Sequence, residues 1–272
     1  MAKEPAFCPE ADRMVSEHEA REPRELQQAH TLLVSDAIVA LEKECISGVV
    51  LVLLVNLARA HWAWGWQRIA FGRWSDAEIA GLRFSKVMGS GKNGGFGLTP
   101  SPSHQGMFCV FESQEHAQAF IDDSPLMARY RASATELFCA TLRIGSVRGS
   151  WEGVHFESDI SMPVTGPIAT LTRASIRPLG AASFWRKAPA AQKSLHKAAG
   201  CDLAIGLGEA PLLRQATFSL WQNTDAMMAY AHTGAHRDAI KAAWEQDFFS
   251  ESMFMRFVPV TVAGTWRGRS FD

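Results

Sequence analysis

One order of elements, strand–helix–strand–strand–helix–strand, occurs twice along this chain, and this repetition constrains its fold more than any other feature. In the first half, apolar runs and turn residues predict strands at 49–58, 81–88, 106–111 and 137–147 and helices at 60–71 and 114–136. In the second half they predict strands at 168–176, 201–209, 213–221 and 251–262 and helices at 181–199 and 224–246. Each half therefore has the element order of a ferredoxin-like unit.

Local similarity between the halves supports a duplication. Phe108-Cys109-Val110-Phe111 corresponds to Phe218-Ser219-Leu220-Trp221, and each half closes with a Gly-X-Trp turn, at 149–151 and at 264–266. A ferredoxin-like half leaves one sheet face open, and packing two such sheets against each other buries both faces. We therefore predict an α+β fold whose two ferredoxin-like halves form a dimeric α+β barrel within one chain, with space for a ligand between sheet and helices.

The repeat divides the chain into three segments. They are an extension at 1–46, a first ferredoxin-like half at 47–165 and a second at 166–272. The extension holds 15 charged residues and precedes the first strand-like run. Within it, residues 24–44 carry apolar side chains at helical spacing, which favours a surface or interface helix, whereas residues 1–20 have the character of a disordered segment.

Composition and charge exclude several classes of protein. With 47% hydrophobic residues and a net charge of −1, the chain can bury a large core but has no overall charge that would attract nucleic acid. Its five cysteines are scattered without a CxxC pair, which is typical of reduced cytoplasmic thiols. The apolar run at 48–55 is far shorter than the roughly 20 residues of a membrane-spanning helix. We therefore expect a cytoplasmic protein without a nucleic-acid partner.

Two histidines in the predicted helix at 224–246 are candidates for chemistry. His232 and His236 are four residues apart, so they would share one face of a continuous helix. A zinc site of the HExxH type needs a glutamate directly after the first histidine, and Thr233 stands there instead. A dedicated zinc site is therefore not expected, and Gly234 could break the helix and move His232 off the shared face.

His236 allows two interpretations. Ile240 and Ala243 follow it on the same helical face, which would place its ring against an apolar wall. An axial haem ligand needs such an imidazole with restricted access for water. The alternative is a histidine that makes a hydrogen bond inside an ordinary core, and the spacing alone favours this alternative.

A glycine-rich segment at 83–96 is a candidate anion site. Its glycines permit a tight loop with exposed amides, and Lys86 and Lys92 could neutralise a propionate or a phosphate. Asn93 follows Lys92 where a Walker loop requires serine or threonine, so the segment is not a Walker loop. A mobile surface loop is the alternative interpretation.

Several short sequence segments between residues 49 and 268, taken together and in this order, are similar to those of a known family. They are Trp62-Ala63-Trp64, Phe84-Ser85-Lys86-Val87-Met88-Gly89-Ser90-Gly91, Ala182-Ser183-Phe184-Trp185-Arg186, Ile205-Gly206-Leu207-Gly208-Glu209-Ala210-Pro211, Gln215-Ala216-Thr217-Phe218-Ser219-Leu220-Trp221 and Phe248-Phe249-Ser250-Glu251-Ser252-Met253-Phe254-Met255-Arg256-Phe257. In these segments the chain resembles the spheroidene monooxygenase family of carotenoid ketolases. The extension at 1–46 lies outside the resemblance.

The resemblance implies a haem-dependent monooxygenase with haem b, and hence iron, as cofactor and O2 as co-substrate. Such an enzyme would hydroxylate an allylic methylene of a carotenoid twice, and loss of water would leave a ketone. It implies His236 as the proximal iron ligand and Arg256 as a catalytic or haem-contacting residue, with Lys86 and His232 as further cofactor contacts. A ferredoxin-type protein would supply electrons.

Other functions and partners remain open from the sequence. The same barrel could hold haem for dehydratase or peroxidase-like chemistry on another apolar substrate, or it could carry haem or lipid without catalysis. The tryptophans at 62, 64 and 66 favour a peripheral contact with the inner face of a membrane as well as core packing. A monomer and a homodimer are both compatible with the sequence.

Overall fold

The computed structural model describes residues 45–75, 78–95, 97–195, 197–210, 213–232, 234, 237 and 248–271, all within one compact unit, 44–272. The expectations for residues 1–44 lie outside the described residues. Among the described helices, none is both long enough and apolar enough to cross a bilayer.

Both halves of the chain form the same four-stranded antiparallel sheet. The first half consists of β2 (Val49–Leu57), α2 (Trp62–Ser75), β3 (Leu82–Gly91), β4 (Pro100–Phe111), α3 (Gln114–Asp123), α4 (Pro125–Ser133) and β5 (Ala134–Gly149). The second consists of β7 (Ile168–Ile176), α5 (Ala181–Leu195), β8 (Cys201–Ala210), β9 (Arg214–Trp221), α6 (Thr224–Ala231) and β10 (Phe249–Trp266). The strand orders β5-β2-β4-β3 and β10-β7-β9-β8 are equivalent, as expected for two ferredoxin-like halves.

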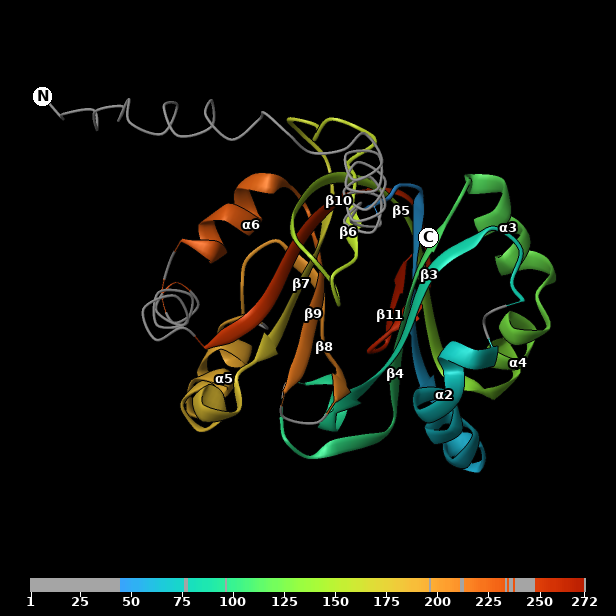
Figure 1. The fold of residues 1–272 in the computed structure, drawn as a ribbon, viewed down its shortest axis with the longest axis horizontal. Helices are drawn as coiled ribbons and strands as arrows, with labels where there is room; N and C mark the ends of the chain where they lie inside the picture. Colours follow the sequence, from blue (N-terminus) through green and yellow to red (C-terminus); the bar gives the residue numbers. More distant parts are fainter. Residues whose placement is uncertain are drawn as a thin grey trace, which may run out of the picture. The chain divides into compact units, whose positions relative to one another are not determined.

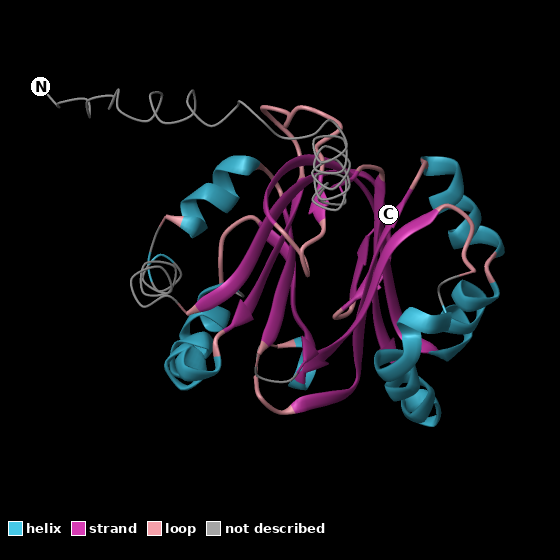
Figure 2. Cartoon of the chain, viewed as in Figure 1, coloured by secondary structure: helices cyan, strands magenta, loops and turns pink. Residues whose placement is uncertain are grey.

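The two sheets join edge to edge into a closed barrel. β5 pairs with β10 and β3 pairs with β8, so eight antiparallel strands form a continuous ring. Several short elements are not part of the eight-stranded ring. They are the 3-10 turns at Arg59–His61 (η1), Lys92–Gly94 (η2) and Pro178–Gly180 (η3) and the strands β1 (Cys45–Ile46), β6 (His155–Phe156) and β11 (Arg269–Phe271). The helices flank the strands on both sides (Figures 1 and 2). The predicted α+β barrel is confirmed.

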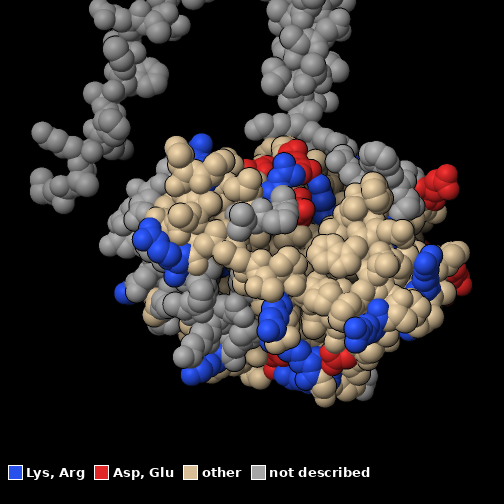
Figure 3. All heavy atoms as spheres, turned by 90° about the horizontal axis from the view of Figure 1, so that it is seen from below, with Lys and Arg blue, Asp and Glu red and all other residues tan. Residues whose placement is uncertain are grey.

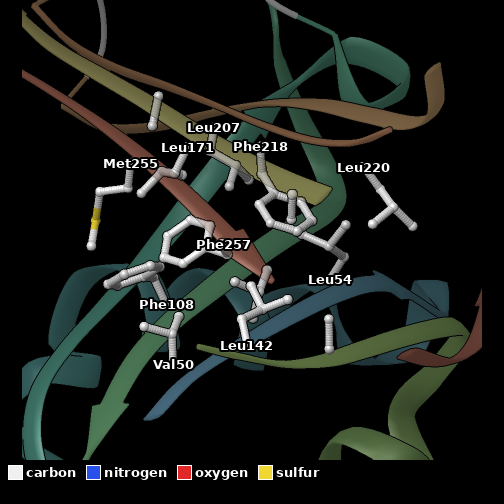
Figure 4. Packing of buried hydrophobic residues seen from close by; sticks show 14 of the residues in the cluster. Val50, Leu54, Phe108, Leu142, Leu171, Leu207, Phe218, Leu220, Met255 and Phe257 are labelled. Carbon is white, nitrogen blue, oxygen red and sulfur yellow. The ribbon is translucent and has the colours of Figure 1, made fainter. Parts of the chain in front are cut away.

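The barrel interior is a continuous apolar core to which both halves contribute. Alternate residues of each strand point inward, and the labelled side chains of β2, β4, β5, β7, β8, β9 and β10 converge in Figure 4. Phe108 of the first half lies 6.3 Å from Phe257 of the second, measured between ring centroids. Because these side chains are almost fully buried, the interior itself is filled rather than hollow.

Two predicted elements of the first half differ from the structure. The single helix predicted at 114–136 is two helices, because the hydroxyl of Ser124 accepts hydrogen bonds from the N–H groups of Leu126 and Met127 and Pro125 starts a new helix. The predicted glycine loop at 89–97 begins as strand, since β3 runs to Gly91. Most other boundaries agree within a few residues.

The two Gly-X-Trp turns mark equivalent points of the seam between β5 and β10. Gly149 pairs with Met253 and has φ +86°, and Gly264 pairs with Phe138 and has φ +98°. A Cβ atom on Gly149 would lie 1.9 Å from the carbonyl oxygen of Ser252, and one on Gly264 would lie 2.1 Å from that of Leu137. Only glycine therefore permits the close approach of the two strands at each point.

We expect Gly149→Ala to lower the free energy of unfolding by about 3 kcal/mol, because it adds a backbone clash to an unfavourable positive φ. Urea denaturation monitored by tryptophan fluorescence measures the change. Gly153→Ala is the matched control: Gly153 has φ +80° but open space around its Cβ position, so the expected cost is about 1 kcal/mol. Equal costs for the two variants would contradict the role assigned to the seam.

Candidate functional site

The outer face of the first sheet is fully used for packing. Alternation along its strands turns large apolar side chains toward α2, α3 and α4, and they form one buried cluster with those helices. The cluster contains Val49, Leu51, Leu53, Val55, Leu57, Met107, Cys109, Phe111, Ala117, Phe120, Met127 and Tyr130. No layer is left there for a large ligand.

The outer face of the second sheet carries mostly small side chains. Strand register aligns them in three rows, each with one residue from β10, β7, β9 and β8 in that order. The first row is Arg256, Thr170, Ser219 and Ala204, the second is Phe254, Thr172, Thr217 and Gly206, and the third is Ser252, Ala174, Gln215 and Gly208. Thr172 is exposed although β7 has a paired strand on each side. The two halves thus share a topology, but in the described residues the rows of small side chains lie on the outer face of the second sheet.

Arg256 is the positively charged residue in these three rows. Its Nη2 lies 3.9 Å from Sδ of Met228 on α6, and its guanidinium carbon lies 5.5 Å from the centroid of the Phe254 ring. Its Nε is buried and has no hydrogen-bond partner among the described residues. A guanidinium with an unused N–H can bind a carboxylate, such as a propionate, at this face.

Aromatic side chains border the same layer. The ring centroids of Trp221 and Tyr230 are 5.4 Å apart. Nε1 of Trp221 donates a hydrogen bond to the hydroxyl oxygen of Ser219 at 2.9 Å. Burial raises the pKa of Tyr230 to about 12, so this phenol stays protonated at neutral pH. Further along, Phe184 of α5 packs against Phe248 and Phe249. These rings form apolar walls beside the small-residue face.

The predicted histidines lie at or beyond the end of α6. Asn223 caps the start of this helix by accepting from the N–H of Ala226, and the helix ends at Ala231. His232 is the exposed C-cap residue, and Gly234 has φ +56°. The helix predicted at 224–246 is therefore interrupted, which corrects the premise of one continuous face. His236 lies outside the described residues, so its proposed role remains a prediction.

Lys86 lies in a different place from Arg256. It lies on the same side of β3 as Phe84 and Met88, which pack inside the barrel, whereas Arg256 lies on the outer face of the second sheet. Its Nζ is 2.5 Å from a carboxylate oxygen of Glu152 and 3.7 Å from one of Glu209. The structure does not bring Lys86 and Arg256 together, and a ligand on the outer face at Arg256 would be separated from Lys86 by the barrel wall.

Lys86 belongs to a charge network that sequence patterns did not predict. Arg173, whose side chain is fully buried, contacts the carboxylates of both Glu209 and Glu251. Nε1 of Trp151 donates to Glu209 at 2.8 Å. The one available signal was an arginine inside the otherwise uncharged strand at 168–176.

Among the acids of this network, Glu251 accepts the most hydrogen bonds from described residues. Burial alone would raise its pKa, but hydrogen bonds from the N–H of Gly153, the hydroxyl of Ser150 and the N–H of Glu152, together with Arg173, lower the pKa to about 2. Glu251 therefore carries its charge at neutral pH. It fixes the turn after β5 to the start of β10, and this turn places Trp151 in the barrel core.

Comparison with known proteins supports the resemblance. No protein-family model matches the chain. It is 51% identical over 82% of its length to a spheroidene monooxygenase of Rubrivivax gelatinosus, covering 86% of that protein. It is also 33% identical to a spheroidene monooxygenase of Rhodobacter capsulatus, over 69% of this chain and 80% of that protein. The chain belongs to the spheroidene monooxygenase family.

Membership of the spheroidene monooxygenase family makes the chain an enzyme, a monooxygenase. The fold is also similar to that of a solved aldoxime dehydratase, with a TM-score of 0.53 and 10% identity over 78% of this chain and 79% of the other. At this identity the likeness concerns the fold alone. Within the described residues, no group of three or more His, Cys, Asp or Glu side chains could hold a metal ion.

We expect Arg173→Met to destabilise the protein by about 3–5 kcal/mol, because two carboxylates at the barrel end would lose their buried counter-ion. Urea denaturation at pH 7 measures the effect. Arg269→Met is the matched control, since Arg269 is 54% exposed in its 2.8 Å pair with Asp202 and should contribute about 1 kcal/mol or less. A loss in Arg173→Met no larger than in this control would show that the network is not a stabilising element.

Proposed function

We propose that this protein is a haem-dependent monooxygenase that oxidises an allylic methylene of a carotenoid such as spheroidene to a ketone with O2. The observation that carries the proposal is the 51% identity, over most of both chains, to a protein named spheroidene monooxygenase. The small-residue outer face of the second sheet supports it, because it offers a layer between sheet and helices bordered by aromatic rings.

The residues of that layer fit a haem. The rows of small side chains would let a flat ring approach the sheet, and Nε of Arg256, which has no hydrogen-bond partner among the described residues, suits a propionate. Arg256 and His236 would hold the haem, Arg256 through a propionate and His236 as the iron ligand. Bound haem would supply the activation of O2 for insertion into a carbon–hydrogen bond.

The protein itself would orient the substrate and limit access of water. Tyr230, Phe184 and Phe249, which are partly exposed, would present apolar surface to a long polyene, and the buried Trp221 and Phe248 support them. The hydroxyls of Thr170 and Ser219 are hydrogen-bonded to each other at 2.9 Å, so they add little unsatisfied polarity to the face. Such a surface suits a carotenoid better than a charged substrate.

The overall reaction defines the partners that the enzyme needs. Two hydroxylations of one methylene consume two O2, four electrons and four protons; loss of water from the resulting diol leaves one ketone, with three waters formed in total. The electrons must come from outside, and a ferredoxin-type protein is the proposed donor. A cytoplasmic location and peripheral contact with the membrane that holds the carotenoid complete the proposal, with a homodimer as one arrangement.

We expect the purified protein to form a Soret band when haemin is added, and His236→Ala to lose or shift that band. Visible spectra with and without reductant measure the effect. His61→Ala is the matched control, because His61 lies in η1 of the first half, away from the outer face of the second sheet, and this variant should bind haem as the parent does.

Arg256→Met separates retention of haem from ligation of its iron. Loss of one charge-assisted hydrogen bond should weaken haem binding by about tenfold while leaving the position of the Soret band unchanged. If the parent binds no haem, the haem-dependent mechanism is wrong. A band that is identical in the parent and in His236→Ala would assign the iron ligand to another residue.

A further inference from the structure

Large apolar side chains are exposed on several connections at one end of the barrel. Leu98 lies between β3 and β4 and is 56% exposed, Leu179 in η3 is fully exposed, and Trp66 of α2 is 45% exposed. Leu213, in the turn between β8 and β9, is 37% exposed. These connections lie in the lower part of Figure 1, and we call the surface they form the lower face. It presents three leucines on three connections, and α2, which also lies in the lower part of Figure 1, carries the exposed Trp66.

The segments of the lower face are basic. Residues 58–75, 92–99, 177–186 and 211–214 contain no aspartate or glutamate, although the whole chain has 28 acidic residues. Arg59, Lys92, Arg177 and Arg186 lie on these segments and are exposed. Figure 3 views this end: Lys and Arg side chains are scattered across it, and the acidic ones lie toward its edges. The lower face therefore combines apolar tips with positive charge.

We propose that the lower face binds the surface of a lipid bilayer that contains anionic lipids. Leucine and tryptophan side chains enter the boundary between head groups and acyl chains, and each nearby Lys or Arg adds attraction to anionic head groups. The inference rests on the proposed function, because a carotenoid is insoluble in water and resides in membranes. It names the surface through which this enzyme would reach its substrate.

The shape of the surface favours a bilayer over another protein. The exposed apolar side chains stand on separate turns and on a helix, rather than forming one continuous apolar patch like the core of a stable protein interface. A bilayer can bind such separated apolar side chains because each side chain inserts independently. A second copy of this chain would present the same basic face and would repel it.

Co-sedimentation of the full chain with vesicles tests the proposal. We expect binding to vesicles of phosphatidylcholine with one-fifth phosphatidylglycerol, weaker binding to pure phosphatidylcholine, and weaker binding in 0.5 M than in 0.1 M NaCl. The double variant Leu98→Glu/Leu179→Glu should reduce the partition coefficient at least tenfold, because it replaces two inserting side chains with charges.

Val164→Glu is the matched control. Val164 is 94% exposed and precedes the start of β7, whereas Leu179 follows the end of that strand. Its vesicle binding should equal that of the parent. The proposal is overturned if the parent does not bind, if the double variant binds like the parent, or if Val164→Glu loses as much binding. A double variant that only changes the oligomeric state in light scattering would assign the face to self-association instead.

Turnover assays keep this proposal distinct from the proposed function. With carotenoid embedded in vesicles the double variant should be at least tenfold slower than the parent, and with detergent-solubilised carotenoid the two should be equal. Vesicle binding that depends on Leu98 and Leu179, without turnover in either assay, would support the lower face and contradict the function. Equal turnover of both proteins on vesicles would contradict a role of the lower face in substrate access.

Discussion

Closure of the barrel through β10 is the constraint on which the rest of the structure depends. This 18-residue strand pairs with β5 of the first half along one edge and with β7 of its own half along the other. Together with the pairing of β3 and β8, it turns two open sheets into one ring and removes their edges from solvent. Gly149 and Gly264 permit the close approach at two points of this seam, and Arg173 with Glu251 ties its beginning to β7.

Closure commits both inner sheet faces to one apolar core, so the outer faces are where the described parts of the two halves differ. The first half fills its outer layer with leucine, valine, methionine and phenylalanine beneath three helices. The second half has mostly threonine, serine, alanine and glycine at the equivalent positions, with Arg256 at one end of a row. One topology thus carries two outer faces of different chemical character, and the proposed haem layer belongs to the second.

The sequence predicted most of what depends on local patterns. The strand at 168–176 is correct to the residue, and the repeated element order led directly to the barrel. The break at Ser124 and Pro125 was missed because helical periodicity continues across it. The charge network was missed for another reason: Arg173 meets Glu209 and Glu251 only through strand pairing, which sequence spacing does not reveal.

The structure separates two residues that the resemblance assigned to one site. Arg256 lies on the outer face of the second sheet, whereas Lys86 points to the inside of the barrel, because it lies on the same side of β3 as Phe84 and Met88. The order of residues in the sequence could not reveal this, because β3 and β10 belong to different halves and their facing directions depend on strand register. His236 lies outside the described residues, so its role stays a prediction.

Isotope labelling tests the central claim, oxygen insertion into a carotenoid, most directly. The parent protein, loaded with haem and supplied with a ferredoxin-type reductant, would be incubated with spheroidene under 18O2 in unlabelled water, and the product would be analysed by mass spectrometry. The account predicts a ketone that carries 18O. A ketone labelled only when the oxygen isotope is in the water would contradict it, and so would the absence of an oxygenated product under reducing conditions.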